Sequence, residues 1–459
     1  MDNPYILMLI ALALLAVIDL VVGVSNDAVN FLNSAIGSKA ISIRNIMIIA
    51  SIGVFFGAIT SSGMMEVARK GIFNPEMFMF QDIMFIFMAV MITDILLLDV
   101  FNTLGMPTST TVSIVFELLG AAVVISLIKI SQNDTESFNA IWNYINYEKA
   151  SLIIFGILLS VVVAFSVGAL VQFLSRLIYS FNFEKRPNYI NALFGGFAIT
   201  AITYFIIIKG MKGTPFYVDV KHLIEDNTLL IIAGSFLLWT LISQLLITFF
   251  NINILKLIIG IGTFSLAMAF SGNDLVNFVG VPIAAWNSYQ IWETSGISAT
   301  TFSMGVLAQK VPSNVFLLLF AGAIMVVTLW TSSKARNVIK TGIDLSRQGE
   351  GHEKFKPNPL SRLVVRASMG INSGLSYIIP AKTIAFVDSK FQKPVIELPK
   401  DKTYELPAFD MIRASVNLIV AGILISIATS MRLPLSTTYV TFMVAMGTSL
   451  ADRAWGRES

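Results

Sequence analysis

The 459-residue sequence contains no cysteine and only two histidines, His222 and His352. Without cysteine the chain can form neither a disulfide nor a thiolate metal site. Both histidines fall in polar stretches outside the long apolar runs, which excludes an imidazole-based metal or acid–base centre within those runs. These absences weigh against most enzyme classes, and we therefore expect a protein that is not an enzyme and that carries no cofactor.

Charged residues are scarce as well. Lys, Arg, Asp and Glu make up 13% of the chain, about half the share typical of soluble domains, whereas 55% is hydrophobic and the mean hydropathy is +0.77. The net charge of +3 gives no reason to expect a nucleic-acid partner. Several apolar runs exceed the roughly 18–20 residues that a helix needs to cross a bilayer. The composition predicts an all-α polytopic membrane protein, and the first run, which lacks a basic flank and a small-x-small cleavage site, is expected to be a retained helix.

Two polar motifs occur twice in the same order. The segments GVSNDAVNFLNS (23–34) and SGNDLVNFVG (271–280) share the pattern Asn-Asp-x-Val-Asn-Phe. Each is followed by Pro-x-Ser-Thr-Thr, as PTSTT at 107–111 and PLSTT at 434–438. The second pair is more widely spaced, which we assign to two longer loops at about 286–312 and 333–410. The repeated order predicts an internal duplication.

The apolar runs predict eleven spans. They are 5–36 (interrupted near 23–27), 43–62, 83–104, 107–131, 150–180, 189–210, 226–250, 252–285 (interrupted near 271–274), 313–332, 411–431 and 434–451. The close boundaries 104/107 and 431/434 are typical of hairpins. Because an odd number of spans precedes the second series, the two repeats are expected to have inverted topology, with substrate held by broken helices.

This interpretation divides the chain into five parts. They are the first repeat core (1–131), connecting transmembrane helices (132–250), the first part of the second repeat (251–332), a basic loop (333–410) and the second part of that repeat (411–459). The first series continues into a long span at 150–180 that has no counterpart after residue 451, so we expect C-terminal helices to be missing from this sequence.

Charge predicts the orientation in the membrane. Residues 334–405 carry 13 Lys and Arg against 7 Asp and Glu, which favours a cytoplasmic location, although long loops follow the positive-inside rule less strictly. The short loop with Lys39 and Arg44 falls on the same side by span count. We therefore expect an N-terminus outside the cell and a multi-pass protein of the cytoplasmic (inner) membrane.

Six acids lie inside the predicted spans, away from their terminal residues: Asp19, Asp27, Asp94, Asp99, Glu117 and Asp274. Such acids are costly in a bilayer and commonly mark ion or substrate paths. Asp27 and Asp274 stand out because each has an Asn three residues later, on the same helix face. Helix capping is the alternative explanation, but a helix that begins within the membrane also exposes N–H groups that attract an anion. For Asp94, Asp99 and Glu117, packing and a contribution to an ion path are equally open.

The chemistry of these motifs favours a protonated oxyanion. Proline suits the first turn of a helix, and the hydroxyls after it can donate beside free backbone amides, although Ser and Thr in membrane helices often bond to neighbouring helices instead. Hydroxyls and helix N-termini favour an anion that carboxylates oppose, unless a cation or a proton accompanies it. Hydrogen phosphate can donate its P–OH to a carboxylate, whereas sulfate has no proton at neutral pH. The remaining oxygen ligands suit Na⁺.

These segments resemble the inorganic phosphate transporter family (the solute carrier 20 phosphate permeases) over nearly the whole chain. GVSNDAVNFLNSAIGSKA and FSGNDLVNFVGVPIAA look like its two Gly-x-Asn-Asp signatures, and LGMPTSTTVSIVFELLGAA and LPLSTTYVTFMVAMG like its paired Pro-x-Ser-Thr-Thr helices. The resemblance implies a homodimeric symporter that moves inorganic phosphate with a cation by alternating access. It implies phosphate ligands at Asp27, Ser109, Thr110, Thr111, Asp274, Ser436, Thr437 and Thr438. It further implies sodium ligands at Asn26, Asp27, Asn30, Asn273, Asp274 and Asn277.

One departure affects the coupling ion. Many members of the family have His directly after Ser-Thr-Thr, where this chain has Val112 and Tyr439. Proton coupling through imidazole is thereby excluded, which favours Na⁺, while protonation of Asp27 or Asp274 stays open. The alternatives are H⁺-coupled phosphate transport, transport of sulfate, arsenate or a metal–phosphate complex on the same scaffold, and a passive anion channel. A remote alternative is an intramembrane enzyme acting on a phosphorylated lipid, for which the sequence offers no nucleophile–base pair.

Overall fold

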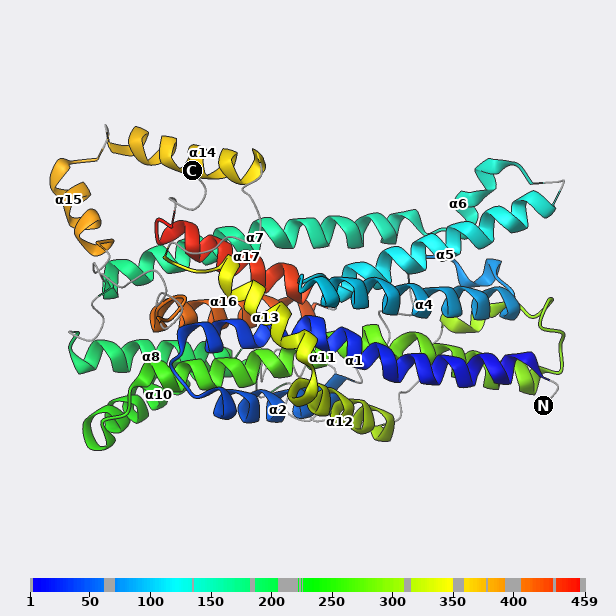
Figure 1. Cartoon of the computed structure of the whole chain (residues 1–459), viewed down its shortest axis with the longest axis horizontal. Coiled ribbons are helices and arrows are strands. Elements are labelled where there is room, and N and C mark those ends of the chain that lie inside the picture. The colour runs from blue at the N-terminus through cyan, green and yellow to red at the C-terminus, as the bar shows by residue number, and fades with distance from the viewer. Residues whose placement is uncertain are drawn as a thin grey trace.

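The chain folds into long helices that run side by side along one direction (Figure 1). The computed structural model describes residues 3–61, 71–133, 136–181, 186–204, 222, 224, 226–308, 315–349, 359–376, 379–392, 406–431 and 435–454. Within these ranges no β-strand is formed. The expected all-α class is therefore confirmed.

The helices of the first half are α1 (Pro4–Ser38), α2 (Ile43–Thr60), α4 (Phe80–Leu104), α5 (Thr110–Gln132), α6 (Ile141–Tyr144), α7 (Tyr147–Tyr179), α8 (Asn188–Ile202) and α10 (Thr228–Phe250). Those of the second half are α11 (Ile254–Ser295), α12 (Val315–Thr331), α13 (Ser333–Leu345), α14 (Pro359–Ser376), α15 (Ala381–Lys390), α16 (Met411–Ser430) and α17 (Thr437–Ala451). Short 3₁₀ helices occupy Pro75–Met77 (η2), Phe138–Ala140 (η3) and Met304–Ala308 (η6).

Seven helices of the described chain are long and apolar enough to cross a membrane, and α12 with α13, bent by 71°, would make an eighth. This finding confirms a multi-pass membrane protein. The surfaces of these helices are also those expected of membrane spans. Large apolar side chains such as Leu14 (62% exposed) and Leu229 (83% exposed) face outward, where lipid would cover them. The predicted span 189–210 forms α8 as far as Ile202, followed by two π-helical residues, and its residues from 205 onward lie outside the described part.

The two Asn-Asp motifs lie within continuous helices. We expected interruptions near 23–27 and 271–274, but α1 and α11 pass through both segments without a break. The expectation was wrong because these Asn and Asp side chains bond to other helices rather than cap their own backbone; for example, Asn26 donates to Asn102. The i→i−4 backbone ladder therefore needs no local break. The break between α12 and α13, in contrast, follows from Ser332, whose hydroxyl accepts from Ala335 N and caps α13.

Helices α1 and α11 form the centre of the molecule, and they pack against each other as well as against α4, α2 and α16. Glycine permits several of the close approaches. A Cβ on Gly57 of α2 would lie 2.3 Å from the carbonyl oxygen of Met268 on α11. A Cβ on Gly447 of α17 would lie 2.1 Å from the carbonyl oxygen of Phe165 on α7. These contacts hold α2 against α11 and α17 against α7.

The segment 333–410, which we expected to be a polar loop, contains three helices in its described part. Helix α13 packs against α1, where the hydroxyls of Ser332 and Ser25 lie 2.7 Å apart and Gly342 lies against Val29. Helices α14 and α15 lie away from α1 and α11, at the upper left of Figure 1. The other expected loop, 286–312, is shortened in the same way because α11 continues to Ser295.

Candidate functional site

The site is built on the first turns of α5 and α17. Ser109 and Ser436 are the N-caps, and their hydroxyl oxygens accept hydrogen bonds from Val112 N (3.2 Å) and Tyr439 N (3.0 Å). The Thr pairs that follow therefore stand in the first turns, beside backbone N–H groups that have no partner within their helices. Pro107 precedes the cap of α5 by two residues, so its expected place in the first turn was wrong. Pro434 lies outside the described residues.

Asp27 of α1 is bound by both of these helix starts. Its carboxylate accepts hydrogen bonds from Thr110 Oγ1 of α5 at 2.8 Å and from Thr438 Oγ1 of α17 at 3.0 Å. Asn30, one turn further along α1, donates Nδ2–H to Asp27 at 3.3 Å and to Thr438 at 2.9 Å. The carboxylate thus joins three helices that are far apart in the sequence.

Asp274 of α11 makes the matching set of contacts. It accepts hydrogen bonds from Thr111 Oγ1 at 3.1 Å and from Thr437 Oγ1. Asn277 donates to Asp274 at 3.3 Å and to Thr111 at 3.0 Å, and Asn273 donates to Asp274 at 3.0 Å. Each acid therefore receives one hydroxyl from each of the two Ser-Thr-Thr motifs, which brings all four sequence motifs together.

The pocket is buried and carries two acids close to each other. Asp27 and Asp274 are both 0% exposed, and they lie near enough to interact electrostatically. The hydrogen bonds given above come from neutral hydroxyls and amides, which orient the carboxylates without neutralising them. Burial of an uncompensated charge is costly. For an anion to enter such a pocket, a cation or a proton would have to accompany it.

Asn26, expected among the sodium ligands, secures the connection between α4 and α5. Its Nδ2 donates to Asn102 Oδ1 at 2.8 Å and to the carbonyl oxygen of Met106 at 3.1 Å. Its Oδ1 accepts from the backbone N–H of Thr108 at 2.8 Å. These bonds hold the short segment that delivers the N-cap Ser109 to the site.

Residues 23–343 match the sequence profile of the Phosphate transporter family. The chain belongs to this family. The match spans the first copy of both motifs and the second Asn-Asp motif, so it confirms the resemblance drawn from those residues.

Three curated archaeal relatives of this phosphate transporter family member agree with the assignment, each named "Putative phosphate permease". The Thermococcus kodakarensis protein is 27% identical over 43% of this chain and 44% of its own length. The Pyrococcus horikoshii protein is 24% identical over 65% of this chain and 68% of its own length. The Pyrococcus furiosus protein is 33% identical over 22% of this chain and 25% of its own length. The matches thus span from a quarter to about two thirds of these relatives.

The fold is also known from a solved structure. A chain titled "The sodium-dependent phosphate transporter" superposes with a TM-score of 0.62 at 18% identity, covering 97% of this chain and 90% of the other. At this identity the likeness establishes the fold of the family member and nothing finer.

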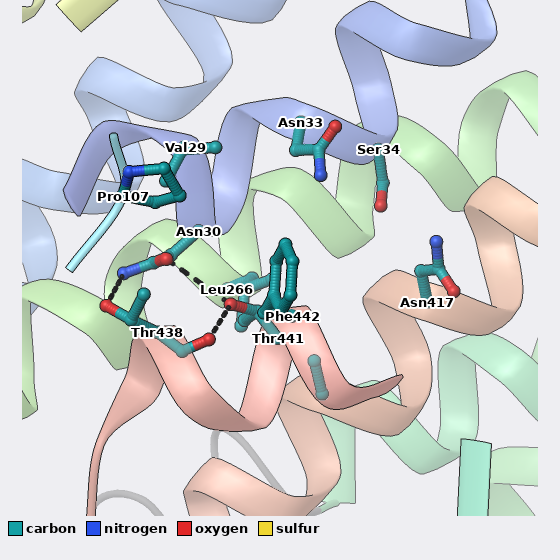
Figure 2. Close-up of a pocket in the computed structure, with 11 residues that line it drawn as sticks. Val29, Asn30, Asn33, Ser34, Pro107, Leu266, Asn417, Thr438, Thr441 and Phe442 are labelled. Carbon is teal, nitrogen blue, oxygen red and sulfur yellow. Dashed lines mark hydrogen bonds between the residues drawn. The ribbon is translucent and has the colours of Figure 1, made fainter. Parts of the chain in front are cut away.

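A small cavity opens beside the Asn30–Thr438 hydrogen bond (Figure 2). Its volume is about 20 Å³, enough for one water molecule. The lining includes four polar side chains that sequence reasoning missed: Asn33, Ser34, Asn417 and Thr441. Two of these could have been found from the helix period, since Asn33 follows Asn30 and Thr441 follows Thr438 by three residues. Asn417, on α16, belongs to no motif.

The remaining acids lie apart from the Asp27–Asp274 pair. Asp99 of α4 forms an ion pair with Lys334 of α13 at 2.6 Å, with about half of its side chain exposed. Asp94 and Glu117 come together with a third acid, Asp19, between α1, α4 and α5. The six predicted intramembrane acids therefore divide into a central pair, a surface ion pair and a separate cluster of three.

Proposed function

We propose that this phosphate transporter family member is a Na⁺-coupled symporter that carries inorganic phosphate across the cytoplasmic membrane by alternating access. The observation that supports this proposal most is the crossed bonding of Asp27 and Asp274 to both Thr pairs. Two buried acids, faced by hydroxyls and helix N-termini, fit a ligand that is anionic but carries a proton of its own.

Phosphate would enter by exchanging hydrogen-bond partners. Its P–OH group donates to Asp27 or Asp274. Its other oxygens accept from the Thr hydroxyls that now donate to these carboxylates, from the Ser109 and Ser436 hydroxyls, and from the first-turn N–H groups. The proposed phosphate ligands are Asp27, Ser109, Thr110, Thr111, Asp274, Ser436, Thr437 and Thr438. The displaced carboxylates are then free for cations.

Sodium would complete the charge balance. Na⁺ is a hard cation and takes oxygen ligands, which the carboxylates and the amide carbonyls of the two Asn-Asp motifs supply. The proposed set is Asn26, Asp27, Asn30, Asn273, Asp274 and Asn277. For Asn26, sodium binding requires release of its bond to Thr108, so it is the least suited of the six. Bound Na⁺ would shift the conformational equilibrium only to the extent that it binds one state better than the other.

The transport cycle follows from the proposed duplication. We assign residues 1–131 and 251–459, apart from the 333–410 segment, to two inverted repeats that rock against each other around the central pocket. The orientation, with the N-terminus outside and 333–410 in the cytoplasm, and the homodimer remain proposals. Reaction of cysteines introduced at exposed Phe138, which lies between two predicted spans, and at exposed Leu360 with an impermeant thiol reagent tests the orientation. Cross-linking in native membranes tests the dimer.

Uptake of ³²P-phosphate into proteoliposomes tests the coupling. An inward Na⁺ gradient should drive accumulation above equilibrium, and replacement of Na⁺ by choline at constant pH should abolish it. Equal accumulation in choline with an imposed pH gradient would contradict Na⁺ coupling and support H⁺ coupling. Uptake that only equilibrates would indicate a passive channel, and competition by excess sulfate would contradict phosphate selectivity.

A further inference from the structure

Three acids that the proposed function does not use meet between three helices. They are Asp19 of α1, Asp94 of α4 and Glu117 of α5, and we refer to them as the acid cluster. Asp94 lies within interaction range of both other carboxyl groups and of the Ser113 hydroxyl. Asp19 and Asp94 are 0% exposed. A cluster of this composition inside a membrane protein requires a source of positive charge or of hydrogen-bond donors.

The described residues supply neither a positive charge nor a hydrogen-bond donor to the buried pair, Asp19 and Asp94. Both carboxyl oxygens of Asp19 and both of Asp94 lack a hydrogen-bond partner among them, as does Oε2 of Glu117. Ser113 has a single hydroxyl hydrogen, and it donates to Glu117 Oε1 at 2.7 Å. Ionised carboxylates only accept hydrogen bonds, whereas a protonated one gains an O–H donor. One added proton therefore converts two mutually repelling acceptors into a donor–acceptor pair.

Within the described residues, no positively charged group acts on the cluster in place of that proton. The groups that act on its carboxyls are the three acids themselves and Asp27, which is also negative. Several charged groups on the surrounding helices have partners of their own: Lys129 of α5 pairs with Asp82 of α4, and Lys334 of α13 pairs with Asp99 of α4. On α11, Asp274 lies in the pocket and Glu293 accepts from Tyr289. The remaining cations of α11 and α13, which are Lys256, Arg336 and Lys340, are not among the groups that act on the cluster. The surroundings add negative charge.

The geometry favours a proton over a divalent metal ion. Within the described chain no three His, Asp or Glu side chains converge closely enough to ligate such an ion, whereas two adjacent carboxyls suffice to share a proton. We propose that the acid cluster is a proton-binding site, separate from the phosphate pocket, in which Asp19 and Asp94 share a proton that is exchanged through Glu117. In each exchange Glu117 takes a proton from water and passes it to the Asp94 carboxylate, or returns it by the reverse transfer.

An open groove reaches Glu117. It lies between α4 and α5 and has a volume of about 710 Å³; most of its lining is apolar, and Glu117, Ser113 and Ser109 are among its polar side chains. Glu117 is the one partly exposed member of the cluster. The groove also reaches Ser109, the cap of α5 at the phosphate pocket. Asp19 precedes Asp27 by eight residues, or about 12 Å along α1. The cluster therefore lies where its protonation can influence α1 and α5, two of the helices that form the phosphate pocket.

Infrared difference spectroscopy on the full-length protein tests the proton directly. At neutral pH the wild type should show a protonated-carboxyl C=O band that shifts in ²H₂O. Asp94→Asn and Asp19→Asn should each remove it, and the matched control Asp99→Asn, on the same helix as Asp94 but in an ion pair with Lys334, should retain it. If the wild-type band persists in both cluster variants, or is absent from the wild type, the proposal is wrong. If the wild type shows no carboxyl band and Asp94→Asn abolishes binding of ²²Na⁺, the cluster binds sodium, and this result would also overturn the proposal.

A transport measurement tests the role of Glu117. The pH profile of phosphate uptake is recorded for the wild type, Glu117→Gln and Asp99→Asn, and the variants are compared at each pH so that titration of phosphate itself cancels. Glu117→Gln should shift the profile by at least one pH unit or flatten it, whereas Asp99→Asn should superpose on the wild type. A Glu117→Gln profile parallel to the wild type contradicts exchange through Glu117. The infrared arm needs no phosphate, so it stays informative even if the substrate or its coupling ion is different from that proposed.

Discussion

Asp27 and Asp274 stand on different helices in opposite halves of the chain, yet each accepts hydrogen bonds from the same two helix starts. Thr110 and Thr438 donate to Asp27, while their chain neighbours Thr111 and Thr437 donate to Asp274. Because adjacent threonines serve different acids, a displacement of either α5 or α17 changes the bonding of both carboxylates at once. This crossed arrangement couples the two acids mechanically, without a direct bond between them.

The first prediction concerns the two acids. Asp27→Asn and Asp274→Asn should each reduce Na⁺-driven phosphate uptake by about 10- to 100-fold, since a hydrogen bond to a charged group contributes about 1.5–3 kcal/mol and the negative charge that attracts Na⁺ is also lost. Uptake of ³²P-phosphate into proteoliposomes measures the effect. Asp99→Asn serves as the matched control and should transport normally. Wild-type rates in both pocket variants would contradict the assignment of the site.

The second prediction uses the crossed bonds themselves. Thr110→Val and Thr438→Val remove hydroxyls from the same carboxylate, whereas Thr110→Val and Thr437→Val remove them from different ones. In a double-mutant cycle on the apparent phosphate affinity, the first pair should show an interaction energy of about 0.5–3 kcal/mol and the second pair should be more nearly additive. Equal coupling in the two cycles would mean that the crossed pattern has no energetic consequence.

The third prediction concerns the close approach of α7 and α17. Gly447→Ala places a Cβ 2.1 Å from the carbonyl oxygen of Phe165, so the helices must separate, at a cost of about 1–3 kcal/mol for overpacking. Gly156→Ala of α7 is the control, because nothing lies within 4 Å of its added Cβ. Thermal unfolding in detergent should show a lower midpoint for Gly447→Ala and not for the control. Equal midpoints would indicate that this packing is not tight.

The fourth prediction concerns a buried ion network at the ends of α7 and α17. Arg176 donates to both carboxyl oxygens of Asp452, at 2.7 and 2.8 Å, and to both of Asp410, at 2.6 and 3.0 Å. Burial alone would raise the pKa of Asp452, but the Arg176 guanidinium, together with Arg413 and Gln172, outweighs this effect and holds the pKa below its ordinary value. Arg176→Met removes the cation that pairs with both acids, leaving Arg413 as the remaining cation near Asp452. It should destabilise the protein by about 3–5 kcal/mol, as measured by unfolding.

The same network predicts the direction of a pH effect. Because the pKa of Asp452 is lower in the folded than in the unfolded chain, its contribution to stability is present above the unfolded pKa of about 3.9 and is lost as the pH falls through the folded value. The unfolding midpoint of the wild type should therefore drop on acidification below about pH 4. Asp452→Asn should show a smaller drop, and an identical slope in the variant would exclude this origin.

Much of the site could be predicted from the sequence because its residues occur as repeated motifs. Asp27, Asp274 and the two Thr pairs are conspicuous as polar groups in apolar surroundings, and the energetic cost of burying them makes their convergence a reasonable expectation. Asn33 and Thr441 continue the same helix faces at the same period, and the cavity shows that the pattern should have been extended by one turn. Asn417 gave no signal, because its place at the cavity depends on how α16 packs.

The helix breaks could not be predicted correctly. Asn and Asp within an apolar run favour a cap by local propensity, and this reasoning placed breaks near 23–27 and 271–274. Tertiary hydrogen bonds instead occupied these side chains, and α1 and α11 remained continuous. The actual break, at Ser332, follows an apolar run and begins a helix within what composition indicated to be a loop.

The sequence alone determined that this chain lies in a membrane, that it is duplicated in its motifs, and that it belongs with phosphate transporters, because hydropathy, motif order and residue type do not depend on packing. Only the tertiary structure decided which acid each threonine serves, and that Asp19, Asp94 and Glu117 form a cluster of their own. These relationships depend on the rotation and depth of each helix against its neighbours, which side-chain packing sets and which a linear pattern does not contain.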